Sequence, residues 1–75
     1  MSKLPAIRAR DLVRAAERSG FVFDRQRGSH AVYYRESDHR RIVIPVHVGQ
    51  DLKPGTLRAI ITDMGLTVDE FIVML

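Results

Sequence analysis

The sequence predicts a small two-layer α+β domain in which helices cover one face of a three-stranded antiparallel sheet. Two segments, residues 9–19 and 54–64, carry apolar side chains at helical spacing. Three short runs of β-type residues lie between these segments, and their connections are too short to hold a crossover helix. The expected order is α-β-β-β-α with a short extra C-terminal helix. We treat residues 1–75 as one domain, with residues 1–7 as a leader.

The first predicted helix covers residues 9–19. Arg14 and Arg18 lie one turn apart and form a basic stripe on this helix. The apolar side chains that share the opposite side are those of Ala9, Leu12, Val13 and Ala16. Gly20 is the expected C′ residue, because glycine readily adopts the left-handed conformation that ends many helices.

The predicted strands comprise residues 21–26, 29–35 and 40–46, which are rich in branched and aromatic side chains. In a regular first strand, Phe21 and Phe23 point to the same side, and we assign that side to the core. The short connection between the first two strands indicates a hairpin.

The hairpin turn is predicted at Arg27 and Gly28, because glycine tolerates the positive φ that tight turns often need. Alternation divides the second strand into a face with His30, Val32 and Tyr34 and a face with Ala31, Tyr33 and Arg35. If His30 faces solvent, Val32 faces it too, unless the turn introduces a bulge. The sequence leaves both arrangements open.

The third strand carries Ile42, Ile44 and Val46 on one face. Pro45 cannot donate a ladder hydrogen bond, so it is expected on an edge or at the end of the strand. Residues 36–39, between the second and third strands, are polar and typical of a turn.

The clearest amphipathic helix begins at Pro54, whose missing N–H suits a first helical turn, and it ends at Gly65. Thr67 and Glu70 match a capping box, which predicts the start of the short last helix. The side chains assigned to the core from these two helices are Leu57, Ile60, Ile61, Met64 and Phe71.

The formal net charge is +3, and the basic residues are concentrated in one half of the chain. Residues 1–41 contain ten of the twelve lysines and arginines against five acidic residues, a net charge of +5, whereas residues 42–75 carry −2. Such a basic half favours phosphate contact, although the same arginines could simply be solvated on a helix face.

Several classes of protein are excluded by composition. The hydrophobic content of 45% and the charged content of 28% fit a globular domain and not a disordered chain. The sequence has no cysteine, so it forms neither a disulfide framework nor a cysteine metal site. It shows no export signal and no apolar run of transmembrane length, and a cytoplasmic protein is therefore expected.

A histidine with arginines close to it in the predicted hairpin suggests chemistry on a polyanion. His30 lies at the start of the second strand, and Arg25 and Arg27 precede it across the turn. Imidazole titrates near neutrality and can move a proton, and the planar guanidinium group binds phosphate through two N–H groups. A lone histidine in a strand is more often structural, so the residues by themselves leave both roles open.

Four short motifs follow one another at compact spacing. They are Gly20-Phe21, Arg27-Gly28-Ser29-His30, Ile44-Pro45-Val46-His47 and Lys53-Pro54-Gly55-Thr56-Leu57-Arg58. Together these motifs resemble those of the HicA-type toxins, and the resemblance extends over residues 8–75. It implies a fold like that of double-stranded RNA-binding domains, in agreement with the order of elements given above.

The resemblance also implies a function and a site. HicA-type proteins are toxins of type II toxin–antitoxin systems that cleave mRNA and are neutralised by a HicB antitoxin. His30, in an intact Gly-Ser-His motif, is implied to be the catalytic residue. We expect Arg25, Arg27, Gly28 and Ser29 to contact RNA, with the arginines stabilising charge in the transition state. Contact with DNA is expected only through the antitoxin complex.

A second group of candidates lies at the start of the helix that begins near residue 54. Lys53, Thr56 and Arg58 could bind an RNA phosphate there, because the N-terminus of a helix favours anions. The alternative is ordinary helix capping by Thr56 or Asp51. The sequence favours neither.

The other histidines and the tyrosines are weaker candidates. His47 could assist as an acid or base, but a hydrogen bond to the loop backbone is favoured, and His39 is expected to be solvated. Tyr33 and Tyr34 could stack on a base, although at least one of them is expected in the core. The three histidines lack the tight spacing of a zinc site, so we expect metal-independent cleavage with no cofactor.

The competing function is a non-catalytic double-stranded RNA-binding module, since the order of elements is shared. Such modules carry a lysine cluster at the start of their last main helix. Here only Lys53 is present at that position, among Asp51, Pro54 and Gly55. This difference favours the nuclease.

Overall fold

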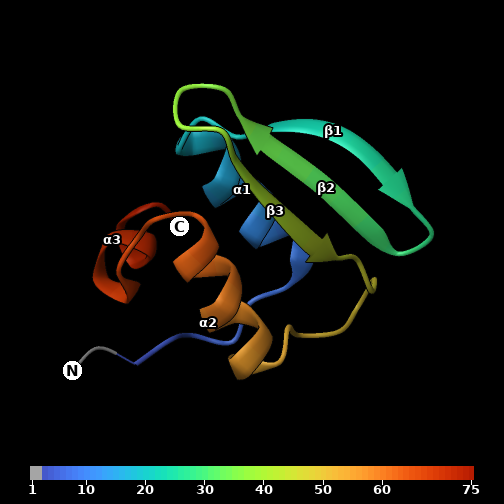
Figure 1. Cartoon of the computed structure of the whole chain (residues 1–75). Coiled ribbons are helices and arrows are strands. Elements are labelled where there is room, and N and C mark those ends of the chain that lie inside the picture. Colours follow the sequence, from blue (N-terminus) through green and yellow to red (C-terminus); the bar gives the residue numbers. More distant parts are fainter. Residues whose placement is uncertain (1–2) are drawn as a thin grey trace.

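The computed structural model describes residues 3–75 and confirms the predicted fold class. The elements are α1 (Ala9–Arg18), β1 (Val22–Arg27), β2 (His30–Arg35), β3 (Arg40–Pro45), α2 (Pro54–Asp63) and α3 (Val68–Val73). The three strands form one antiparallel sheet, and the helices lie on one side of it (Figure 1). The predicted ends of the elements agree with these or differ from them by one residue.

The sheet order is β1-β2-β3, so β2 is the central strand and the other two strands are edges. Arg27 pairs directly with His30, which leaves Gly28 and Ser29 as a two-residue turn. The predicted turn at Arg27 and Gly28 was therefore wrong by one residue. Gly28 has a φ of +58°, the conformation that the first position of a type II′ hairpin turn requires.

The core lies between the sheet and the helices. Ala31 and Tyr33 of β2 face it, and their partners Ile44 and Ile42 on β3 are almost completely buried. Burial, followed by the negative charge of Glu17, raises the pKa of Tyr33. The predicted core side chains of α2 and α3 are all buried: Leu57, Ile60, Ile61, Met64 and Phe71.

Phe21 and Phe23 do not share an environment, so their joint assignment to the core was wrong. Phe21 precedes β1 and is only 1% exposed, whereas Phe23 is 55% exposed. Phe23 does point to the helix side, where its ring meets that of Tyr33 edge-on at 5.6 Å. However, β1 is an edge strand and every one of its residues is exposed, because no helix covers this part of the sheet.

The helix ends follow the local sequence signals. Gly20 has a φ of +97°, and the N–H groups of Phe21 and Gly20 donate to the carbonyls of Ala16 and Glu17 in a Schellman motif. The predicted capping box of α3 is present, with the Glu70 N–H donating to the Thr67 hydroxyl and the Thr67 N–H donating to the Glu70 carboxylate.

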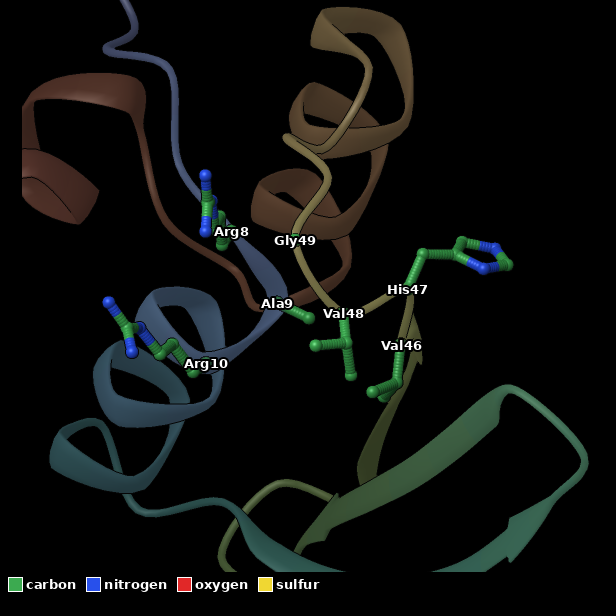
Figure 2. A pocket seen from close by; sticks show the side chains of 7 residues that line it. All are labelled: Arg8, Ala9, Arg10, Val46, His47, Val48 and Gly49. Carbon is green, nitrogen blue, oxygen red and sulfur yellow. The ribbon is translucent and has the colours of Figure 1, made fainter.

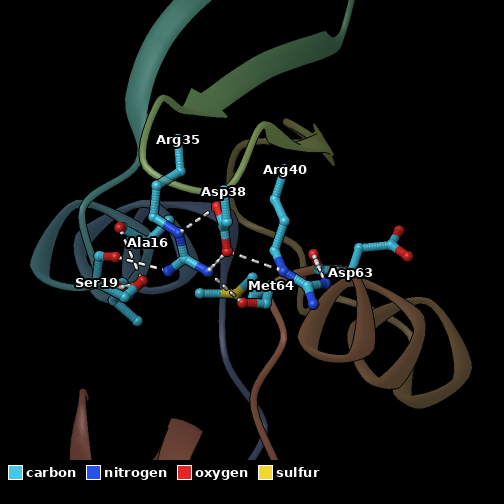
Figure 3. Close-up of polar contacts among 8 residues, drawn as sticks. Ala16, Ser19, Arg35, Asp38, Arg40, Asp63 and Met64 are labelled. Atoms are coloured by element: carbon cyan, nitrogen blue, oxygen red, sulfur yellow. Dashed lines mark hydrogen bonds and ion pairs between the residues drawn. The ribbon is translucent and has the colours of Figure 1, made fainter.

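One arginine joins the C-terminal ends of two helices, which no sequence pattern predicted. Arg35 lies on the core side of β2, and its guanidinium group donates to the carbonyls of Ser19 after α1 (2.8 Å) and Met64 after α2 (2.9 Å) (Figure 3). The same group forms two hydrogen bonds with Asp38 and lies over the ring of Phe21. A positive charge at two helix C-termini also complements both helix dipoles.

The carboxylate of Asp38 is shared by two arginines (Figure 3). Hydrogen bonding to Arg35, the largest cause, lowers the pKa of Asp38 to about 2, and Arg40 contributes in the same direction. In the unfolded chain this carboxyl titrates near its ordinary value of 3.8. Because the folded state keeps the proton off at lower pH, Asp38 stabilises the fold above about pH 4.

We therefore expect the stabilising contribution of Asp38 to be lost as the pH falls from about 4 to about 2. Urea denaturation of wild type and Asp38→Asn across this range would measure it. The wild type should lose its advantage over the variant as the solution becomes more acidic. A difference between the two proteins that stays constant through this window would contradict the assignment.

Candidate functional site

The helices lie on one side of the sheet (Figure 1), and the register places the predicted site residues Arg25, Arg27 and His30 on the other side. Residues directly opposite each other in an antiparallel sheet share one face, so the pairing places nine residues there in three rows. We call this surface the open face. Its rows, taken from β1 to β3, are Val22-Tyr34-Arg41, Arg25-Val32-Val43 and Arg27-His30-Pro45.

A bulge in β1 brings Arg25 to the open face. Phe23 pairs with Tyr33 and Arg25 pairs with Val32, so Asp24 is an extra residue on this strand. In a regular strand Phe23 and Arg25 would point to the same side. The extra residue reverses the alternation, so that Phe23 faces the helix side while Arg25 and Arg27 face the same side as His30.

The strand pairing answers the question that the sequence left open about β2, because the register shifts only at Asp24 of β1 and not at the turn of Gly28 and Ser29. The faces of this strand are those that alternation predicts, with His30, Val32 and Tyr34 together on the open face. His30 is exposed, whereas Val32 is only 6% exposed although no helix covers it. The reason is its central position, flanked by Arg25 and Val43 on the neighbouring strands.

His30 and Arg27 are direct neighbours across the two-residue turn of Gly28 and Ser29. Arg27 has no ion-pair partner among residues 3–75, so its guanidinium group is available to an external anion. Arg25 lies one row away and forms an ion pair with Asp24 at 2.9 Å, which partly neutralises it. Of the two arginines predicted to bind phosphate, Arg27 is consequently the stronger candidate.

His47, Lys53 and Thr56 come together near the same corner of the molecule. They line a shallow hollow of about 230 Å³ together with Pro45, the direct neighbour of His30 in the sheet. Neither Thr56 nor Asp51 caps α2, because Lys53 is the N-cap residue and no side chain bonds there, so the predicted capping alternative was wrong. Lys53 and Thr56 of the predicted second group thus extend the corner that holds His30.

Arg58 lies apart from this group. It lines a different hollow, of about 410 Å³, between the start of α2 and the segment that begins at Lys3. The structure therefore brings Lys53 and Thr56 towards His30 through Pro45 and His47, but it does not bring Arg58 with them.

The imidazole of His47 points away from the start of α1 and is exposed (Figure 2). The expected hydrogen bond of the His47 side chain to the loop backbone is not formed within residues 3–75. The hydrogen bond at this position is between main-chain groups, the Gln50 N–H donating to the His47 carbonyl. Arg8 and Arg10, at the start of α1, line a small hollow of about 150 Å³ together with Val46 and Val48, and the two guanidinium groups point away from the valines (Figure 2).

The end of the open face farthest from His30 contains three residues that the sequence did not link. His39 is exposed, as expected, and its Nδ1 and the hydroxyl of Tyr34 are in addition joined by a hydrogen bond of 2.6 Å. His39 has a φ of +57° within the turn before β3. Arg41 lies over the Tyr34 ring at 5.6 Å. The alternation of β3, with Ile42 and Ile44 inward, could have identified Arg41 as an outward residue.

Two further observations concern other classes of function. Within residues 3–75, no three histidine, cysteine, aspartate or glutamate side chains are grouped in a way that could hold a metal ion. No helix in that part of the chain is both long and apolar enough to cross a membrane.

Comparison with known proteins assigns the family. The family model of the HicA toxin of bacterial toxin–antitoxin systems matches residues 9–66, which is more than half of the chain. No curated protein sequence matches the chain significantly. The matched region runs from the start of α1 past the end of α2 and includes the whole sheet with His30. The chain belongs to the HicA family of toxins of bacterial toxin–antitoxin systems.

Proposed function

We propose that this toxin is a metal-independent ribonuclease that cleaves mRNA, with His30 as its catalytic residue. The observation that carries the proposal is the pairing of His30 with Arg27 on an exposed sheet face, in a chain of the HicA family. An exposed imidazole beside a guanidinium group without a carboxylate partner combines proton transfer with phosphate binding.

The reaction begins with attack of a ribose 2′-oxygen on the adjacent phosphorus. The bond from phosphorus to the 5′-oxygen of the next nucleotide breaks, which leaves a 2′,3′-cyclic phosphate and a 5′-hydroxyl. His30 takes the proton from the 2′-hydroxyl or gives one to the leaving 5′-oxygen. Arg27 binds the non-bridging oxygens, where negative charge increases in the transition state, and Arg25 adds a weaker contribution.

The neighbouring corner supplies further contacts. Lys53 and Thr56, in the hollow that Pro45 and His47 also line, bind an adjacent phosphate of the same strand. His47 is the auxiliary candidate for the second proton transfer, because it lies in the chain two residues after the neighbour of His30. Gly28 and Ser29 keep the backbone turn compact at the point where RNA approaches.

We further infer that the antitoxin partner is a HicB-like protein with acidic groups that cover the open face. Arg25, Arg27 and Arg41 give this face an excess of positive charge, which complements an acidic surface. The alternative of a non-catalytic duplex-binding module is less well supported, because the start of α2 contributes only Lys53 and not the lysine cluster of such modules.

The test is to incubate the purified toxin with RNA in EDTA and to analyse the ends of the products. We expect cleavage that leaves cyclic phosphates and no cleavage at a linkage whose 2′-hydroxyl is replaced by hydrogen. Cleavage that requires a divalent metal ion, or that yields 3′-hydroxyl ends, would contradict the mechanism.

A further inference from the structure

We propose that Tyr34 and Arg41, held by His39, form a stacking platform for a base of single-stranded RNA on the open face. The inference rests on the proposed function, because the RNA that meets the platform is the one that His30 cleaves. It adds a recognition site to the catalytic corner and specifies an unpaired strand as the substrate.

The geometry at this end of the sheet fixes the orientation of the tyrosine ring. The hydroxyl of Tyr34 is bonded to Nδ1 of His39 at 2.6 Å, and the guanidinium carbon of Arg41 lies 5.6 Å from the ring centroid. The imidazole of His39 is tilted against the same ring, with 6.3 Å between the centroids. An aromatic group that is already positioned loses little conformational freedom when a ligand stacks on it.

The fold itself does not account for this arrangement. Tyr34 points away from the helices and is not part of the hydrophobic core, unlike its neighbour Tyr33. Arg41 forms no ion pair with any group in residues 3–75, so no carboxylate in that part of the chain neutralises its charge, and its guanidinium group lies over the Tyr34 ring. An aromatic ring and a free guanidinium group on one surface are the two features that bind nucleobases by stacking.

The platform and the catalytic corner lie on one continuous surface. Tyr34 and His30 are four residues apart on the central strand, which corresponds to about 13 Å at the rise of a β-strand. Between them the middle row presents Arg25 to a phosphate and Val43 to a sugar or base. An extended RNA strand can therefore contact the platform and His30 together.

The chemistry selects a single strand over a duplex. In a duplex the base faces are covered by neighbouring base pairs, so a flat aromatic surface cannot reach them. A single strand exposes its bases to aromatic side chains while its phosphates meet basic groups. Arg25 and Arg27 provide those basic groups along β1, on the same face as the ring.

The test measures binding of a 2′-O-methylated single-stranded RNA of mixed sequence. Its 2′-oxygens cannot attack the adjacent phosphorus, so the RNA stays uncleaved and the toxin can keep its catalytic residues. Tyr34→Ala is expected to weaken binding about tenfold, the usual result of removing one stacked base. Tyr34→Phe keeps the ring and should bind within about twofold of wild type, because only an exposed hydrogen bond is lost. The same RNA annealed to its complement should bind more weakly than the single strand.

Arg14→Ala is the control, because it removes an exposed positive charge from α1 on the other side of the sheet. Folding of each variant is checked by circular dichroism, and Tyr34→Phe remains informative if Tyr34→Ala is unstable. The proposal is overturned if Tyr34→Ala binds as tightly as Arg14→Ala, if Tyr34→Phe binds as poorly as a folded Tyr34→Ala, or if the duplex is preferred.

The outcome is separable from that of the proposed function. If RNA is cleaved but Tyr34→Ala changes neither binding nor kcat/KM, the platform is wrong and the nuclease stands. If RNA binds through Tyr34 but neither the wild type nor any variant cleaves it, the platform stands and the ribonuclease proposal fails.

Discussion

Replacing His30 with alanine is expected to reduce the rate of RNA cleavage by about 10²- to 10⁴-fold, the usual contribution of a general acid or base. The fold should be unaffected, because His30 is exposed and makes its sheet contacts through the backbone. We expect its free energy of unfolding to change by no more than about 0.5 kcal/mol. Cleavage is measured in EDTA on a labelled RNA, and folding is checked by thermal denaturation.

His47→Ala is the informative companion to this variant. If His47 supplies the second proton transfer, its loss should also slow cleavage and remove one limb of the pH–rate profile. If His47 is only a solvated loop residue, the rate should remain near that of wild type. A folded His30→Ala protein that cleaves RNA as fast as wild type would rule out the proposed catalytic role, whatever His47 does.

Replacing Arg35 with methionine is expected to lower the free energy of unfolding by about 3 kcal/mol. The variant loses two charge-assisted hydrogen bonds to the carbonyls of Ser19 and Met64, at the C-terminal ends of α1 and α2. Methionine keeps much of the apolar stem but offers no donor. For a domain of this size such a loss lowers the melting temperature by more than about 10 °C.

Arg14→Met is the matched control for this effect, since Arg14 is exposed on α1 and forms no ion pair in residues 3–75. It should change the free energy of unfolding by less than about 0.5 kcal/mol. The carbonyls, and not the Asp38 ion pair, are expected to account for most of the effect of Arg35. Arg35→Met should therefore remain strongly destabilising in an Asp38→Asn background. Equal effects of Arg35→Met and Arg14→Met would show that Arg35 does not hold the helix ends together.

This role of Arg35 bears on how the basic half of the chain is interpreted. Arg18, Arg35 and Arg40 donate to main-chain carbonyls at or after the ends of α3, α1 and α2. Arg27 and Arg41 face outward on the sheet without ion-pair partners among the described residues. The charge excess is thus divided between holding the fold and presenting a surface to an anion, which net charge cannot distinguish.

Much of the architecture could be read from local patterns. Helical spacing identified α1 and α2, and the Thr67 capping box identified the start of α3. Alternation gave the two faces of β2 correctly, and Gly20 was correctly placed after α1. These features succeed because each depends on residues within a few positions of one another. The four short motifs, taken together, likewise indicated the family from the sequence.

The remaining features depend on which strands and helices come together. The bulge at Asp24 determines that Arg25 shares a face with His30, and it exists only in the register that β1 adopts against β2. The exposure of Phe23 follows from the absence of a helix beneath an edge strand, a fact about packing that alternation cannot contain. The pairing of Arg35 with Met64 joins residues 29 positions apart. By itself the sequence determined the elements, their order and the candidate histidine. Only the tertiary structure decided which arginines face the solvent beside it, because register and helix placement are settled by contacts between distant parts of the chain.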